Sequence, residues 1–92
     1  MSSKSILVMG RRDHTEAMRV AAGLTICGND VRLVLMTEPV AETQENAEQV
    51  ELLELSDITP ETTVKEMSNA LDFLNADDLG QVIAQSDCVI SI

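Results

Sequence analysis

The sequence has almost no aromatic residues: Phe73 is the only one among 92 residues, and there is no tryptophan or tyrosine. Single-stranded nucleic acids and flat cofactors usually stack on aromatic side chains, so such a chain is a poor candidate to bind either. Hydrophobic residues nevertheless make up 45% of the sequence. We therefore expect one small globular domain, residues 1–92, with an aliphatic and methionine core and no cofactor.

Basic residues are also scarce, with 6 lysines and arginines against 16 acidic residues. Residues 1–36 hold five of the six and have a net charge of +2, whereas residues 37–92 hold only Lys65 and have a net charge of −12. Such a surface repels a phosphate backbone, which argues against a nucleic-acid partner. The acidic part instead favours a protein partner with a basic face.

Long apolar runs and a metal-binding motif are missing as well. No stretch approaches the roughly 20 apolar residues of a membrane-spanning helix, and MSSKS is too short for a signal peptide. We therefore expect a cytoplasmic protein that does not enter a membrane. Cys27, Cys88 and the single His14 cannot make up a metal site. In a reducing compartment both cysteines are expected to be free thiols.

The first third of the chain has the pattern of a strand, a helix and a second strand. Residues 5–9 (SILVM) and 31–36 (VRLVLM) are apolar enough to be strands buried on both faces. Between them, apolar residues recur at i, i+3, i+4 and i+7, which predicts an amphipathic helix. Asp13 or Thr15 can cap its start, and Gly28 can end it. These segments predict a βαβ unit.

The rest of the chain also alternates between apolar and polar segments. Residues 37–49 are predicted to be a surface loop, with a frayed helix as the alternative, and residues 50–55 a third strand. Thr59 and Pro60 have the pattern of a helix start, with the helix running to about residue 67. The remaining predicted elements are a short strand or extended link at 70–74, a helix from 75 or 77, and a final strand at 87–92.

This order of elements predicts a single-domain α/β fold: an open, mainly parallel sheet of flavodoxin-like type, with helices on both faces. The sequence stops within its last predicted strand. We therefore expect that strand to lie at a sheet edge that a neighbouring subunit covers, in a homo-oligomer or with related subunits.

Four segments carry a likeness to a known family: SILVM, HTEAMRVAAGLTICGND, VRLVLMTEPV and LDFLNADDLGQVIAQSDCVISI. They resemble the DsrE/DsrF/DsrH (Tus) superfamily of small sulfur-relay proteins, and the last is most similar to the DsrH/TusB-like branch. The resemblance implies a DsrE-like fold, assembly into trimers or hexamers and, in active members, a cysteine that carries a persulfide. Active members place it after the third strand, where this sequence reads LELSDITPE and has none.

The two cysteines lie elsewhere than the resemblance would place a sulfur carrier. If the protein transfers sulfur, Cys88 or Cys27 would be the carrier. Cys27 falls at the end of the first helix, where the partial negative charge works against a thiolate, so packing of the helix end is the alternative. Cys88 falls near the amino end of its strand, where burial in the core is the alternative. With no reactive cysteine, the protein would be a non-catalytic subunit.

The turn Gly10-Arg11-Arg12-Asp13-His14 is the best-placed candidate site. It follows the carboxyl end of a strand and precedes a helix, where backbone N–H groups favour anions. Arg11 and Arg12 add donors for phosphate, sulfate, carboxylate or an anionic sulfur species. In the alternative interpretation the arginines pair with acidic neighbours or with another subunit, and His14 is a surface or capping residue. The preferred prediction is thus sulfur relay, or a non-catalytic subunit of such a complex, and the alternative is a small-anion-binding, regulatory or scaffold module with no reactive cysteine.

Overall fold

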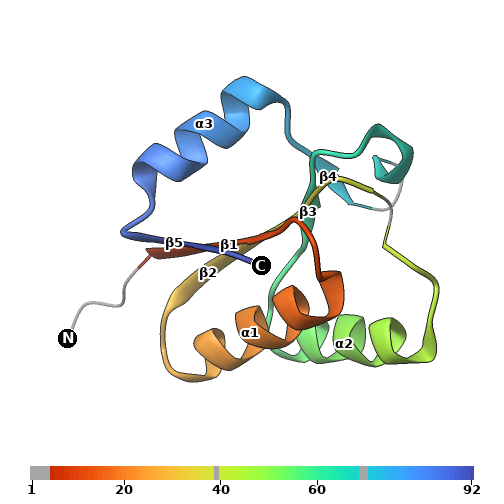
Figure 1. Cartoon of the computed structure of the whole chain (residues 1–92). Coiled ribbons are helices and arrows are strands. Elements are labelled where there is room, and N and C mark those ends of the chain that lie inside the picture. The colour runs from red at the N-terminus through yellow and green to blue at the C-terminus, as the bar shows by residue number, and fades with distance from the viewer. Residues whose placement is uncertain (1–4, 39, 69–70) are drawn as a thin grey trace.

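A computed structural model describes residues 5–38, 40–68 and 71–92 of this protein. They form one all-parallel sheet in the order β4-β3-β2-β1-β5. The strands are β1 (Ser5–Gly10), β2 (Asp30–Leu35), β3 (Glu61–Thr62), β4 (Asp72–Phe73) and β5 (Cys88–Ser91). Helices α1 (His14–Ile26) and α2 (Gln44–Leu55) cover one face, and α3 (Ala76–Gln85) covers the other (Figure 1). The predicted open parallel α/β fold is confirmed.

Helix α1 begins and ends where its sequence signals predict. The Asp13 side chain accepts a hydrogen bond from the backbone N–H of Glu16 at 3.0 Å. At the other end Gly28 has a φ of 90°, a conformation that glycine adopts without strain. The Gly28 and Asn29 N–H groups bond to the carbonyls of Thr25 and Leu24, which is the hydrogen-bond pattern of a Schellman motif. The βαβ unit is therefore set by local signals.

The core consists of two layers, one on each face of the sheet. Alternation along β1 sends Ile6 and Val8 toward α1 and α2, and Leu7 toward α3. The larger layer comprises Ile6, Val8, Ala17, Met18, Ala21, Ala22, Leu33, Leu35, Leu53 and Ile58. The smaller one comprises Leu7, Val34, Leu74 and Val82. The core is aliphatic with one methionine, as its composition predicts.

The segment from 44 to 55 is a helix, so the predicted loop at 37–49 and the strand at 50–55 are wrong. The Thr43 side chain caps α2 by accepting from the N–H of Asn46 at 3.1 Å. Asn46 is buried and its side chain bonds to Thr15 on α1 and to the Ala41 carbonyl. Glutamate, glutamine, alanine and leucine dominate 44–55 and all favour helix. This propensity outweighs the short apolar run that suggested a strand.

The helix predicted from 59 to about 67 is also wrong. Pro60 precedes strand β3, and only a 3₁₀ turn, η1 (Lys65–Met67), follows. Thr62 is fully buried: its hydroxyl donates to the Leu35 carbonyl at 2.8 Å and accepts from the Val64 N–H at 3.0 Å. Because proline lacks an N–H, it suits the entry to a strand as well as the first turn of a helix. Pairing with β2 decides between them.

An ion pair ties the short strand β3 to β2. The Arg32 guanidinium donates to both carboxylate oxygens of Glu61, at 2.9 and 2.7 Å. The hydrogen bond to Glu61 raises the pKa of Arg32 above its ordinary value. Such a two-point contact across neighbouring strands helps hold a strand of only two residues in register.

The last third of the chain largely follows its prediction. β4 lies within the expected extended segment, whose first residue, Ala70, falls outside the described residues. Asn75 caps α3, and β5 lies at an edge of the sheet, as expected. Its coverage by a neighbouring subunit stays a prediction. No helix in the described part of the chain is long and apolar enough to cross a membrane.

Candidate functional site

The strand order reverses between β1 and β5. The chain passes from β1 through β2 and β3 to β4, and α3 then returns it to the other side of β1. In open α/β sheets, ligands bind outside the carboxyl ends of the strands where such a reversal occurs. Here that position is occupied by the turn after Gly10 and by Ser91 and Ile92 at the end of β5.

Gly10 lets α1 start in close contact with the sheet. A methyl group added at Gly10 would lie 3.0 Å from the Ala17 Cβ and 3.0 Å from the Leu35 Cδ2. Carbon atoms in ordinary contact lie about 3.5–4.0 Å apart. Gly10 is therefore a positioning residue that brings the arginine turn to the end of β1.

The backbone N–H groups of Arg11 and Arg12 bond to the end of the chain segment that follows β5. The N–H groups of Arg11 and Arg12 both donate to the Ile92 carbonyl, at 2.7 and 2.9 Å. Asp13 occupies the cap of α1 with its own carboxylate. The expectation that backbone N–H groups of this turn hold an anion is therefore wrong for Arg11 and Arg12, and binding falls to the side chains.

Arg11 and Arg12 are exposed and line a hollow of about 420 Å³ together with Ser91 and Ile92. Among the described residues the ion pairs are Arg19–Glu16 and Arg32–Glu61, so neither Arg11 nor Arg12 takes part in one. Pairing of both arginines with acidic neighbours in the same chain finds no support among these residues. Pairing with another subunit stays a prediction. Two guanidinium groups and the Ser91 hydroxyl can supply several hydrogen-bond donors to one anion.

His14 does not line the hollow and instead holds the start of α1 in place beside it. Its Nε2 lies 2.8 Å from the carbonyl oxygen of Met36, and the ring is half-buried. A carbonyl oxygen only accepts, so Nε2 carries the hydrogen. The Met36 N–H in turn donates to the Gly10 carbonyl at 2.9 Å. His14 thus joins the start of α1 to the end of β2.

The end of α1 and the start of β5 lie at the opposite, amino edge of the sheet (Figure 1), and the two cysteines belong to these ends. Cys27 is the C-cap residue of α1 and Cys88 is the first residue of β5, paired with Ile6. Both are exposed free thiols, so the packing roles considered for them are not what the structure shows. Cys88 and Ile92 are four residue steps apart along extended chain, about 13 Å at 3.3 Å per step. Within one chain, Arg11 and Arg12 therefore do not contact a sulfur species on Cys88.

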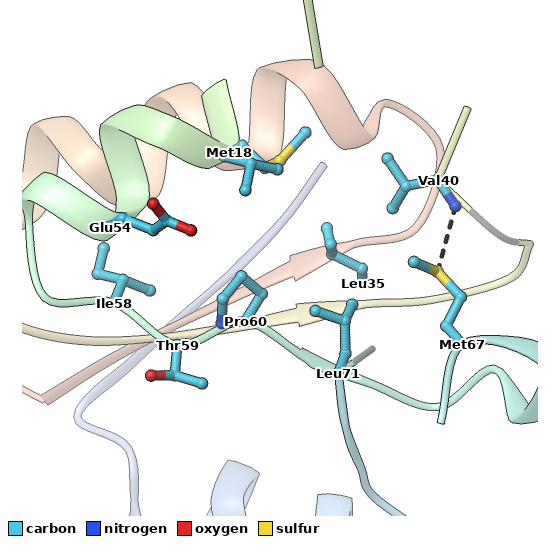
Figure 2. A pocket seen from close by; sticks show the side chains of 10 residues that line it. Met18, Leu35, Val40, Glu54, Ile58, Thr59, Pro60, Met67 and Leu71 are labelled. Carbon is cyan, nitrogen blue, oxygen red and sulfur yellow. Dashed lines mark hydrogen bonds between the residues drawn. The ribbon is translucent and has the colours of Figure 1, made fainter. Parts of the chain in front are cut away.

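The place of Ser91 in this site and a second cavity elsewhere on the sheet are not evident in the sequence. Ser91 joins the arginines only because β5 pairs with β1, where its partner Met9 lies 82 residues earlier in the chain. A separate, apolar cavity lies between α1, α2, the residues 58–60, Met67 and Leu71 (Figure 2). This cavity exists only because residues 44–55 form a helix, which supplies one of its walls.

In the described ranges no three histidine, cysteine or acidic residues gather to hold a metal ion.

Comparison of this chain with protein-family models, curated proteins and solved structures finds no match. What the protein does is therefore inferred from its own residues.

Proposed function

We propose that this protein binds a small anion, of the size of phosphate, sulfate or a carboxylate, at the carboxyl edge of its sheet. The observation that carries this proposal is the hollow lined by Arg11 and Arg12 where β1 and β5 end. Two exposed guanidinium groups with no ion pair among the described residues stand out on a chain of net charge −10. Their mutual repulsion falls when an anion binds between them.

The overall charge limits the kind of anion. A long polyanion would meet the acidic residues beyond the hollow, whereas a small one meets only the local positive charge. Planar guanidinium groups also suit the oxygens of a tetrahedral or carboxylate anion. The protein would then be a ligand-binding or regulatory module in which no cysteine reacts.

Arg11→Ala and Arg12→Ala are each expected to weaken binding of phosphate or sulfate about tenfold or more, the loss of one charge-assisted contact. Isothermal calorimetry at low salt would measure the dissociation constants. Arg19→Ala is the matched control, because Arg19 is exposed on α1 but paired with Glu16 and outside the hollow. Equal weakening by all three substitutions would contradict a specific site.

Persulfide transfer in the cytoplasm, as in the DsrE-like proteins that the sequence resembles, is the second candidate function. It is favoured by one observation: both thiols are exposed and free. A donor persulfide would pass its outer sulfur to the cysteine, leaving the donor as a thiol and Cys88 or Cys27 as the persulfide. Because Arg11 and Arg12 lie at the other edge, a cation near that sulfur would come from a related subunit or a basic-faced partner.

A persulfide donor is expected to add about 32 Da to the protein, reversed by reductant, as for a single persulfidated cysteine. Intact-mass spectrometry of the wild type, Cys27→Ser and Cys88→Ser would assign the carrier. Alkylation of the native protein is the control, since both exposed thiols should react. Full alkylation without any sulfur uptake would exclude the carrier role and leave a binding or scaffold subunit.

A further inference from the structure

A cavity of about 320 Å³ lies on the α1 and α2 face of the sheet, away from the arginine hollow (Figure 2). The residues that line it are Met18, Leu35, Val40, Val50, Glu54, Ile58, Thr59, Pro60, Met67 and Leu71. Met18, Leu35 and Ile58 are buried core residues, with 0%, 2% and 7% of their surface exposed. The Val40 N–H donates to the Met67 sulfur at 3.2 Å, which closes one wall.

The lining selects an aliphatic ligand. Eight of the ten side chains are apolar and none is aromatic, since Phe73 does not reach the cavity. A flat ring would find no stacking surface, whereas an alkyl chain can pack against valine, leucine and the adaptable methionines. The volume is at the low end of the range of about 300–1,000 Å³ for ligand pockets, so the ligand is small.

Glu54 gives the cavity a single charge. It is the only charged one among the described residues of the lining, and Figure 2 shows its carboxylate directed from α2 toward the other lining side chains. It takes part in no ion pair among the described residues. Glu54 also lies in the last turn of α2, which has no basic residue, so the helix dipole adds to the negative potential.

We propose that this cavity binds a small aliphatic ammonium ion, with its alkyl chain on Val40, Val50 and Met67, whose side chains are at least partly accessible, and its ammonium group at the Glu54 carboxylate. The chain's net charge of −10 also attracts a positively charged ligand. An aliphatic carboxylate of equal length would face repulsion from Glu54. This site is separate from the proposed anion site and does not depend on it.

The test compares hexylammonium, hexanol and hexanoate, which each have six carbon atoms in an unbranched chain and differ in charge. Protein labelled with ¹³C at the methionine methyl groups is titrated with each ligand, and the Met18 and Met67 signals are followed by NMR. We expect hexylammonium to bind about tenfold more tightly than hexanoate, with hexanol between them. Shifts of neither methyl in any titration, or tighter binding of hexanoate, would overturn the proposal.

Two substitutions separate the charge from the cavity. Glu54→Gln is expected to weaken hexylammonium binding about fivefold and to leave hexanol binding unchanged. Glu51→Gln is the control, because Glu51 is an exposed acid on the same helix that does not line the cavity. Val50→Phe fills the cavity from a side chain that is 40% exposed, and should abolish binding of all three ligands. Equal effects of Glu54→Gln and Glu51→Gln would overturn the role of Glu54.

Discussion

Leu53→Ala is expected to lower the free energy of unfolding by about 3 kcal/mol, because it leaves a cavity in the larger core layer. Leu53 is fully buried and anchors α2 against α1 and the sheet. Leu55 is 80% exposed, so Leu55→Ala should change the same free energy by less than about 0.5 kcal/mol. Urea denaturation followed by circular dichroism would measure both.

This pair of substitutions also tests the secondary structure of the segment. In a helix, positions two apart lie on different faces, whereas in a strand positions 53 and 55 would point to the same side. Comparable losses for Leu53→Ala and Leu55→Ala would favour a strand and contradict α2. The apolar cavity would then lose its α2 wall, and the ammonium proposal would fall with it.

Gly10→Ala is expected to cost about 2 kcal/mol of stability through overpacking. The added methyl group meets the Ala17 Cβ, which α1 holds in place, and the Leu35 Cδ2. Leu35 can shift within a limited space, since only 2% of its surface is exposed. Thermal and urea denaturation would measure the loss.

Gly23→Ala is the matched control for this substitution. Gly23 lies inside α1, and among the described residues a methyl group added there meets no atom within 4 Å beyond its own turn of helix. The change should therefore stabilise the protein by about 0.5–1 kcal/mol through helix propensity. If Gly10→Ala were as harmless as Gly23→Ala, the close approach of α1 to β1 and β2 would be refuted. If the approach is as described, Gly10→Ala should also weaken anion binding, because it displaces the start of α1.

The two candidate functions occupy opposite edges of the sheet and can be separated experimentally. Arg11 and Arg12 lie beyond the carboxyl ends of β1 and β5, and both cysteines lie at the amino edge. An arginine substitution should therefore leave thiol alkylation unchanged, and Cys88→Ser should leave anion binding unchanged. A change in alkylation caused by an arginine substitution, or a change in anion binding caused by Cys88→Ser, would contradict this separation of the two sites.

Local signals in the sequence were enough to determine the fold class and the first βαβ unit. Two continuous apolar runs predicted β1 and β2, and Asp13 and Gly28 marked the ends of α1. These signals act within a few residues: a carboxylate reaches the next turn of backbone, and glycine alone accepts a positive φ easily. The apolar run that ends at Gly10 and the helix cap at Asp13 likewise predicted that Arg11 and Arg12 follow the end of a strand.

Contacts between residues far apart in the sequence decided the structure of residues 44–55, the element that follows Pro60 and the position of β5. Short apolar runs such as 50–55 suit either a strand or a helix, and burial of Leu53 against α1, together with the Thr43 cap, selected the helix. Pro60 suits the start of either element, and pairing of β3 with β2 selected the strand. The return of the chain through α3 placed β5 beside β1, which brought Ser91 to Arg11 and Arg12 and left Cys88 at the far edge. Strand order depends on contacts between distant residues, and no local pattern encodes it.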